Sequence, residues 1–360
     1  MTPFKGRYWH VIQDNMIECT LCPRNCKLRD GKRGFCFARQ NIGGEMILTS
    51  YGKSSGFCID PIEKKPLNHF LPGTSVFSLG TVGCNLGCKF CQNWDISKAL
   101  DMERLQDEAS PETIANAALQ LGCRSVAFTY NDPVIFLEYA VDIAKSCREV
   151  GINTVAVTAG FITDEARPEF YSVMDAANVD LKGFTQDFYK SICLAQLDPV
   201  LKTLKYLKHE TDVWFEITNL VIPQANDGDD ELKAMCDWIV EELGVDVPIH
   251  FTAFHPDYKM MDRDSTPAST LTRARDIAIS AGINYAYTGN VHDTEGGSTY
   301  CPNCKECLIE RDWYNLNSFH IKDGCCEFCQ FPIVGRFENI PGTWGRRRMP
   351  VRLSDTSPPA

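Results

Sequence analysis

The stretch GCNLGCKFCQNW, residues 83–94, carries Cys84, Cys88 and Cys91 with three and then two residues between them. Thiolates at such close spacing bind zinc or an iron–sulfur cluster, and both kinds of site normally take four protein ligands. No fourth cysteine stands near these three in the chain. Three thiolates can hold three corners of a 4Fe–4S cluster, which leaves the fourth iron open to a ligand from outside the protein.

A second group of cysteines lies near the N-terminus, in CTLCPRNCKLRDGKRGFC. Its members are Cys19, Cys22, Cys26 and Cys36. Four thiolates can close around one zinc ion or hold an auxiliary iron–sulfur cluster, and the spacing does not distinguish the two. We favour zinc, because a closed four-ligand site can supply the folding energy of a small module.

A third group, in YCPNCKEC and CCEFCQ, forms two knuckles roughly 20 residues apart, which is the pattern of a zinc ribbon or rubredoxin. It predicts a structural metal site, with zinc as the expected ion. The CPxC form favours four ligands: Cys301, Cys304, Cys326 and Cys329. Cys307 and Cys325 offer a different register, and disulfides are the alternative to a metal.

The remaining cysteines stand singly and are predicted to be small buried core residues: Cys58, Cys123, Cys147, Cys193 and Cys236. The 360 residues include 18 cysteines and carry a net charge of −11. No signal peptide or long apolar run is visible, so we expect a cytoplasmic protein without a membrane partner. The only dense basic run, residues 346–348, predicts a solvated tail and no nucleic-acid groove.

Apolar runs alternate with helical windows in the middle of the chain, and one helix is predicted to begin after Ser110 with Pro111 in its first turn. The predicted strands are 75–82, 125–130, 153–159, 178–182, 213–222, 249–254 and 284–289. Such repetition predicts an α/β fold with a parallel sheet, in which six or seven units make a partial or complete barrel.

The composition divides the chain into four predicted parts. These are an N-terminal four-cysteine metal module with a connecting segment (1–73), a core barrel (74–292), a C-terminal zinc-ribbon or rubredoxin-like module (293–345) and a tail (346–360).

Loops that follow parallel strands gather at the carboxyl end of the sheet, where ligands bind. The loop with three cysteines follows the first predicted strand directly, so we expect it on that face. Strand alternation places Asp180 and Lys182 on one side of their strand, and Glu216 and Thr218 on one side of theirs. These side chains are expected to point inward, either into a binding site or into a satisfied polar network.

The CxxxCxxC spacing, the aromatic Phe90 and the position after a first strand together resemble the radical S-adenosylmethionine (SAM) enzymes. The likeness extends to YGKSSGFCIDPIEKKPLNHFLPG, CQNWDIS, TYNDP, DLKGF, EITNLVIP, AFHPDY, YTGNV and the final cysteine pairs. Together these motifs resemble the AmmeMemoRadiSam-system enzymes, which are relatives of the pyruvate formate-lyase activating enzymes. The resemblance covers Cys19 to about Phe337 and implies a partial (β/α)6-type radical SAM barrel.

The resemblance implies that the amino and carboxylate groups of SAM chelate the open iron of a 4Fe–4S cluster. Reductive cleavage would then give methionine and a 5′-deoxyadenosyl radical that removes a hydrogen atom from the substrate. The implied partners are a flavodoxin-type or ferredoxin-type electron donor and either AMMECR-type and Memo-type proteins or a glycyl-radical partner protein.

Carried over by motif position, several residues are implied to contact SAM. Asn131 and Asp132 stand where related activases meet the methionyl amino group, Thr158 lies on the third strand, and His255 approaches the ribose or sulfonium. Lys182 is a candidate for the carboxylate, because a flexible ammonium suits a point contact with an anion. The complete predicted set is Cys84, Cys88, Cys91, Phe90, Asn131, Asp132, Thr158, Asp180, Lys182, Glu216 and His255.

Two substrates compete within this class: a glycine of a partner protein, as for activating enzymes, and an unidentified molecule handled beside AMMECR-type and Memo-type proteins. From a different class, the three cysteine groups could belong to a non-catalytic electron-transfer or scaffold protein. That alternative predicts iron and zinc but no SAM binding.

Overall fold

The computed structural model describes residues 3–98 and 107–353. Its centre is a nine-stranded sheet in the order β16-β15-β14-β13-β12-β11-β9-β8-β22. The parallel strands are β9 (Ser75–Leu79), β11 (Ser125–Phe128), β12 (Asn153–Thr158), β13 (Ala176–Asp180), β14 (Trp214–Val221), β15 (Ile249–Ala253) and β16 (Ala286–Gly289). Each predicted strand is present, and the parallel run is one strand longer than a six-fold barrel.

The helices lie between these strands in the chain, as the strand–helix repetition predicts. Their bounds are α1 (Trp94–Ser97), α2 (Pro111–Gln120), α3 (Leu137–Glu149), α4 (Arg167–Tyr171), α5 (Gln186–Phe188), α6 (Asp198–Glu210), α7 (Asp229–Glu242) and α8 (Ala268–Ser280). Helix α2 begins as predicted, because the Ser110 side chain accepts a hydrogen bond from Thr113 N. Every residue of β9 and β11 is buried, which is typical of parallel strands covered on both faces.

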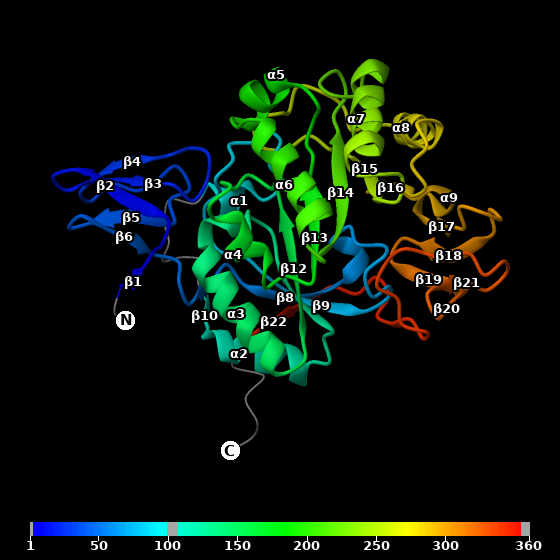
Figure 1. The fold of residues 1–360 in the computed structure, drawn as a ribbon, viewed down its shortest axis with the longest axis horizontal. Coiled ribbons are helices and arrows are strands. Elements are labelled where there is room, and N and C mark those ends of the chain that lie inside the picture. The colour runs from blue at the N-terminus through cyan, green and yellow to red at the C-terminus, as the bar shows by residue number, and fades with distance from the viewer. Residues whose placement is uncertain (1–2, 99–106, 354–360) are drawn as a thin grey trace.

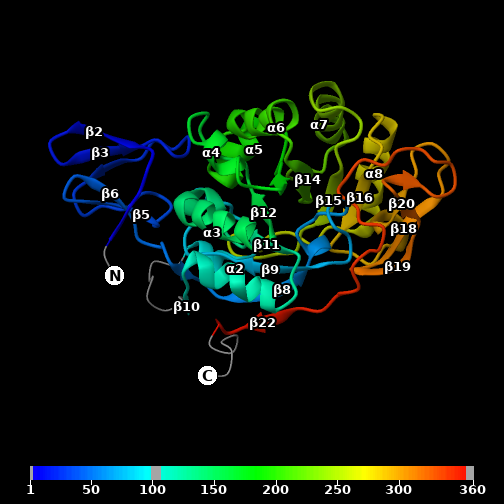
Figure 2. The same cartoon turned by 60° about the horizontal axis from the view of Figure 1, so that its bottom comes forward.

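Two antiparallel strands extend the sheet beyond the predicted barrel. Strand β8 (Phe57–Pro61), from the predicted connecting segment, pairs with β9, and β22 (Met349–Val351) pairs with β8. Figure 2 shows β22 running along the edge formed by β8. The basic run at residues 346–348 is exposed, as predicted for a solvated tail. Residues 349–351 nevertheless form a strand, because β8 leaves an edge whose backbone groups a further strand can pair. The tail residues 354–360 lie outside the described part of the chain.

Two small modules flank the sheet on opposite sides (Figure 1). The N-terminal module contains β1 (Phe4–Lys5), β2 (Trp9–Gln13), β3 (Met16–Cys19), β4 (Lys27–Arg29), β5 (Arg39–Ile42) and β6 (Glu45–Leu48), in two three-stranded sheets. Strand β7 (Lys53–Ser54) pairs with β10 (Asp107–Glu108). The C-terminal module contains α9 (Thr294–Gly297), β17 (Thr299–Tyr300), β18 (Cys307–Asp312), β19 (Asn315–Phe319), β20 (Ile321–Lys322) and β21 (Cys325–Cys326).

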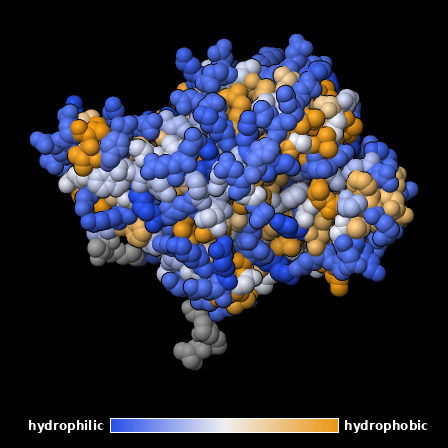
Figure 3. Space-filling view, viewed as in Figure 1, coloured by the Kyte–Doolittle hydropathy of each residue, from blue (hydrophilic) through white to orange (hydrophobic). Residues whose placement is uncertain are grey.

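Short helical turns complete the chain: η1 (Ile62–Lys64), η2 (Pro133–Phe136) and the π-helical η3 (Tyr189–Cys193). The face in Figure 3 is largely hydrophilic, with small apolar patches over α7 and α8 and over the two flanking modules. None of the helices in the described ranges has the length and apolar character that crossing a bilayer requires.

Candidate active site

The loop with Cys84, Cys88 and Cys91 follows β9 at the carboxyl edge of the sheet, as predicted. Its first half is fixed by the side-chain amide of Asn131, from the loop after β11. The Nδ2 of Asn131 donates to Gly83 O at 2.8 Å and to Thr81 Oγ1 at 3.1 Å, and its Oδ1 accepts from Thr81 N at 3.0 Å. Asn131 therefore sets the path of the loop just before Cys84.

The second half of the loop is fixed by the end of η3. Gly87 N donates to Cys193 O at 2.8 Å, and Lys89 N donates to Ile192 O at 3.0 Å. A Cβ on Gly87 would lie 2.7 Å from the end of the Leu194 side chain, so the loop packs closely against the residue that follows η3. Lys98 Nζ also donates to Leu86 O at 2.6 Å.

The three thiols occupy different electrostatic surroundings. Burial, followed by the nearby Asp132 carboxylate, raises the pKa of Cys84 to about 12. The pKa of Cys88 is lowered to about 7, first by a hydrogen bond from the Cys193 thiol and, against the effect of burial, by the charge of Lys182. The Cys91 Sγ lies 3.6 Å from Ser97 Oγ.

The geometry of this loop suits a cluster better than a single ion. Among the described residues, the three sulfurs do not form a set lying within 4.8 Å of one another, although the C-terminal cysteines do. Ligands around one zinc ion stand only about 3.8 Å apart, as follows from Zn–S bonds of about 2.3 Å in a tetrahedron. A 4Fe–4S cluster spreads its thiolates over separate irons. The donor set and its spacing therefore fit that group.

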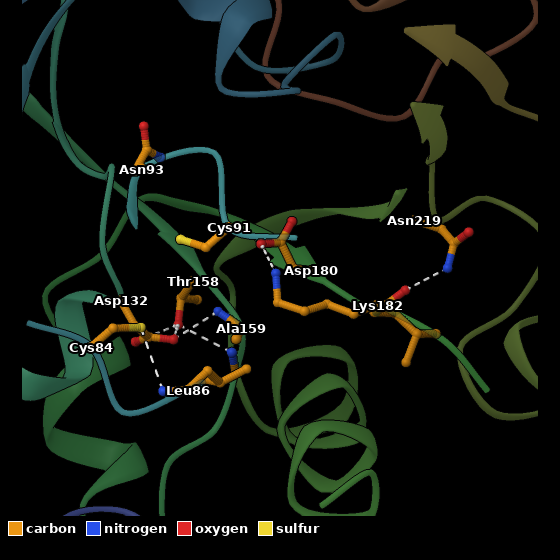
Figure 4. Close-up of polar contacts among 12 residues, drawn as sticks. Cys84, Leu86, Cys91, Asn93, Asp132, Thr158, Ala159, Asp180, Lys182 and Asn219 are labelled. Atoms are coloured by element: carbon orange, nitrogen blue, oxygen red, sulfur yellow. Dashed lines mark hydrogen bonds and ion pairs between the residues drawn. The ribbon is translucent and has the colours of Figure 1, made fainter. Parts of the chain in front are cut away.

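Asp180 and Lys182 meet at the end of β13, and Figure 4 shows both with Cys84 and Cys91. Lys182 Nζ lies 2.7 Å from Asp180 Oδ2 and 5.8 Å from the centre of the Phe90 ring. Burial alone would lower the pKa of Lys182, but Asp180, Cys88 and Cys193 together raise it well above its usual value. The site thus holds a permanent cation beside the cysteine loop.

The Asp132 carboxylate binds the end of β12. It accepts hydrogen bonds from Ala159 N at 2.9 Å and Thr158 Oγ1 at 3.1 Å, as Figure 4 shows. It also accepts one from Val134 N, at the start of η2, at 3.0 Å. Burial raises the pKa of Asp132 to about 6, although these hydrogen bonds oppose the shift. Asp132 and Thr158 therefore lie together, and the Asp132 carboxylate is near Cys84.

Glu216 does not join this group, contrary to the prediction that it contacts the cofactor. Its fully buried carboxylate accepts hydrogen bonds from His250 Nε2 at 2.7 Å, His69 N at 2.7 Å, Asn68 N at 3.0 Å and Trp214 Nε1 at 3.0 Å. These four donors occupy the lone pairs of both carboxylate oxygens, so the carboxylate has no acceptor site left for a cofactor. The expectation of a satisfied polar network is the one that holds for this residue.

His255 follows β15, and its side chain is exposed. Its ring makes a long hydrogen bond of 3.4 Å between Nδ1 and Pro256 O. The exposed ring is therefore accessible to a ligand.

Two contributors to the site carry no signal in the sequence. Cys193 is buried, as predicted for a core cysteine, but it also contacts Cys88, and that contact depends on the fold of η3. Asn219, on β14, donates to Leu181 O at 2.7 Å and so orients the backbone beside Lys182. Both contacts join residues distant in the chain, which local spacing does not reveal.

The C-terminal cysteines form a compact four-sulfur site in the register that the CPxC form favours. All four sulfurs lie within 4.8 Å of one another, with 3.6 Å between Cys301 and Cys329 and 3.7 Å between Cys304 and Cys326. These spacings match the separation of about 3.8 Å around one tetrahedral ion. All 18 cysteines lie in the described ranges, and none of them forms a disulfide in the structure.

Comparison with known proteins agrees with this geometry. A sequence model of the Radical SAM superfamily matches residues 78–239. The uncharacterized protein MJ0808 of Methanocaldococcus jannaschii is 42% identical over 327 residues, which cover 90% of this chain and 97% of that protein.

More distant relatives include activating enzymes. The pyruvate formate-lyase-activating enzyme of Clostridium pasteurianum is 24% identical, over 50% of this chain and 80% of its own length. The 4-hydroxyphenylacetate decarboxylase activating enzyme of Clostridioides difficile is 20% identical, over 57% of this chain and 70% of its own. Among solved structures, Streptococcus suis SuiB bound to S-adenosylmethionine aligns with a TM-score of 0.48 and 14% identity, over 64% of this chain and 53% of that one. The chain therefore belongs to one family with the Methanocaldococcus protein, and it carries a radical SAM domain that is homologous to those of the activating enzymes.

Proposed function

We propose that the protein is a radical SAM enzyme in which Cys84, Cys88 and Cys91 hold a 4Fe–4S cluster with one iron open to SAM. When bound, this group supplies the electron that cleaves SAM to methionine and a 5′-deoxyadenosyl radical, which takes a hydrogen atom from the substrate. The observation that carries the proposal is the convergence of the three-thiol loop and the strand-end pair Asp180–Lys182 at one edge of the sheet.

The chain's own residues bind and orient SAM in this proposal. The Lys182 ammonium attracts the methionyl carboxylate, and Asp180, at 2.7 Å, holds the ammonium in place. Asp132 and Thr158 face the amino group, where the raised pKa of Asp132 leaves it mostly ionised at neutral pH. Phe90 and His255 contact the adenosyl part.

The role of Lys182 is tested by calorimetric titration of the anaerobic, iron-loaded protein with SAM. We expect Lys182→Ala to weaken binding by about tenfold or more, because a charge-assisted hydrogen bond contributes about 1.5–3 kcal/mol. The matched control is Lys202→Ala, which removes an exposed lysine paired with Asp198 on α6. Absence of any heat from the wild-type protein would contradict the enzyme proposal and favour the non-catalytic alternative.

The likeness to activating enzymes favours one specific substrate class, a glycine in a partner protein. The other candidate, which follows from the AmmeMemoRadiSam resemblance, is an unidentified molecule processed beside AMMECR-type and Memo-type proteins. Incubating the reduced, SAM-loaded enzyme with co-purified partners and recording electron paramagnetic resonance separates them. A stable glycyl radical supports the first candidate, and its absence with every partner supports the second.

Three accessory assignments complete the proposal. We assign zinc to the C-terminal site formed by Cys301, Cys304, Cys326 and Cys329, because its sulfur spacing fits one tetrahedral ion. We also propose a cytoplasmic location and a low-potential donor of flavodoxin or ferredoxin type, since reductive cleavage of SAM requires one electron for each turnover.

A further inference from the structure

The four N-terminal cysteines line one cavity between their module and the barrel. Its walls also include Arg24, Gly34 and Arg39 from the N-terminal module and Asn85 from the loop with three cysteines.

The sulfur spacing separates this site from the C-terminal one. Within the described ranges, which include every cysteine, three sulfurs lie within 4.8 Å of one another only in the C-terminal group. The N-terminal cysteines resemble the Cys84–Cys91 loop in this respect, because in neither group do three sulfurs lie close enough together to bind one ion. Zinc, which the sequence favours for this module, therefore suits the N-terminal geometry poorly. Thiolates held apart around a cavity suit a cluster with several irons.

Arg39 provides a second indication that the cavity receives a ligand. Its side chain is 1% exposed, and its terminal nitrogens bond Glu138 at 2.8 and 2.9 Å. Its Nε, in contrast, is buried without a hydrogen-bond partner in the described part of the chain. A buried donor left unpaired costs about 1–3 kcal/mol. A cluster sulfur or thiolate in the cavity would accept this hydrogen bond.

The cavity adjoins the loop with three cysteines. A Cβ built on Gly83 would overlap Cys36 O, so the backbones at Cys36 and at the residue before Cys84 are in contact. Arg24 donates from Nε to Asn85 O, and Asn85 follows Cys84 directly. Cys36, in the N-terminal group, therefore contacts Gly83, and Gly83 directly precedes Cys84 of the proposed radical SAM cluster.

We propose that Cys19, Cys22, Cys26 and Cys36 hold an auxiliary 4Fe–4S cluster through which electrons enter the radical SAM site. This role rests on the proposed function, whereas the presence of the cluster does not. A ferredoxin-type or flavodoxin-type donor reduces the N-terminal cluster by one electron. That electron then passes to the site held by Cys84, Cys88 and Cys91, so the first cluster is reoxidised and the second reduced, with no bond made or broken.

The cluster itself is tested by metal analysis after anaerobic purification. The variant Cys84→Ala/Cys88→Ala/Cys91→Ala removes the radical SAM ligands and leaves the N-terminal group complete. We expect it to retain about four irons and four sulfides and to show the signal of a reduced cluster after dithionite treatment. A variant with no iron and two zinc ions would overturn the proposal while leaving the radical SAM assignment untouched.

Electron entry is tested with Cys22→Ser/Cys26→Ser in the full-length, iron-loaded protein. This variant should lose about half of the iron, because one of two four-iron clusters is removed. Freeze-quench electron paramagnetic resonance then follows reduction of the remaining cluster by reduced flavodoxin. We expect slower reduction than in the wild-type protein, and an unchanged rate would contradict the relay. Unchanged 5′-deoxyadenosine formation with excess dithionite would show that the radical SAM site is intact.

A third variant tests the contact of Arg39. Arg39→Lys keeps the charge near Glu138 but removes the Nε–H donor, so the iron content should remain that of the wild-type protein. Because hydrogen bonds to the sulfurs tune cluster potentials, we expect the midpoint potential of the N-terminal cluster to fall. An unchanged potential would show that Arg39 supports only the fold. Arg33→Lys is the control, since Arg33 hydrogen bonds Phe37 O and Thr49 outside the cavity wall.

Discussion

At the scale of single residues, His69 links three parts of the molecule. Its ring is fully buried, with Nδ1 2.7 Å from Val334 O and Nε2 2.6 Å from Tyr287 Oη. A neutral ring satisfies both contacts by donating to the carbonyl and accepting from the phenol. Burial lowers the pKa of His69 to about 4. The folded protein therefore keeps this histidine neutral well below pH 6.5.

This pKa predicts an acid-sensitive stability. Between pH 6.5 and pH 4 the unfolded chain binds a proton at His69 that the folded chain does not, so the free energy of unfolding falls as the pH falls through that window. The loss attributable to His69 is at most about 3 kcal/mol. His69→Gln, which keeps one donor and one acceptor, should weaken the pH dependence of the melting temperature.

The control for this prediction is His10→Gln, which alters an exposed histidine on β2. It should keep the wild-type pH dependence. Identical curves for all three proteins would contradict the assignment of His69.

The residues of the candidate site were predictable to different degrees. The thiols and Lys182 follow from local spacing, because ligand type and strand alternation are encoded within a few residues. Glu216 looked equivalent to Asp180 by the same alternation, yet its partner Asn68 lies 148 residues away. Its role depends on long-range packing, which alternation does not report.

At the scale of elements, the join between β9 and the cysteine loop depends on Gly83. Its φ is 89°, and a Cβ there would overlap Cys36 O. Gly83→Ala should cost about 1–2 kcal/mol from the left-handed backbone alone, with a further cost from the clash. We expect a lower melting temperature and loss of iron from the reconstituted protein.

Gly122→Ala separates backbone strain from the clash. Gly122 has a φ of 68°, but a Cβ there meets no atom within 4 Å. This variant should lose a similar amount of stability through backbone strain, but it should keep its iron. Equal effects of the two substitutions on iron content would show that contact with Cys36 does not matter.

The sequence identified the parallel strands well, because apolar runs between helical windows mark them. It missed β22 and the assignment of β8 to the sheet. Both strands pair antiparallel at one edge of the sheet. Whether a segment joins an edge depends on the strand beside it, and the residues of the segment itself do not reveal that neighbour.

At the scale of the whole molecule, Arg311 ties the C-terminal module to the connecting segment that precedes the barrel. This side chain is 2% exposed and donates to Asn68 O at 2.8 Å and to Thr299 Oγ1 at 2.8 Å. Loss of the C-terminal metal should therefore destabilise more than the module alone. Cys304→Ser should lower the zinc content by about one ion per chain and the melting temperature with it, while iron is retained.

The neighbouring Cys307→Ser provides the matched control, because Cys307 lies outside the four-sulfur group. It should keep its zinc. Zinc loss in Cys307→Ser together with retention in Cys304→Ser would point to a different ligand register.

The arrangement of the three cysteine groups could not be predicted from the sequence. Their presence follows from spacing, but the N-terminal module meets the barrel through contacts such as Arg39 with Glu138, which are 99 residues apart. The cavity beside the cysteine loop exists only because of that docking.

The central claim is that the loop of three cysteines supports reductive cleavage of SAM. Its most direct test is 5′-deoxyadenosine formation by the anaerobically reconstituted protein with dithionite and SAM. The wild-type protein and Cys236→Ala, which alters a buried cysteine on α7, should both form the product. Cys88→Ala should form none, and product formation by Cys88→Ala at the wild-type rate would contradict the claim.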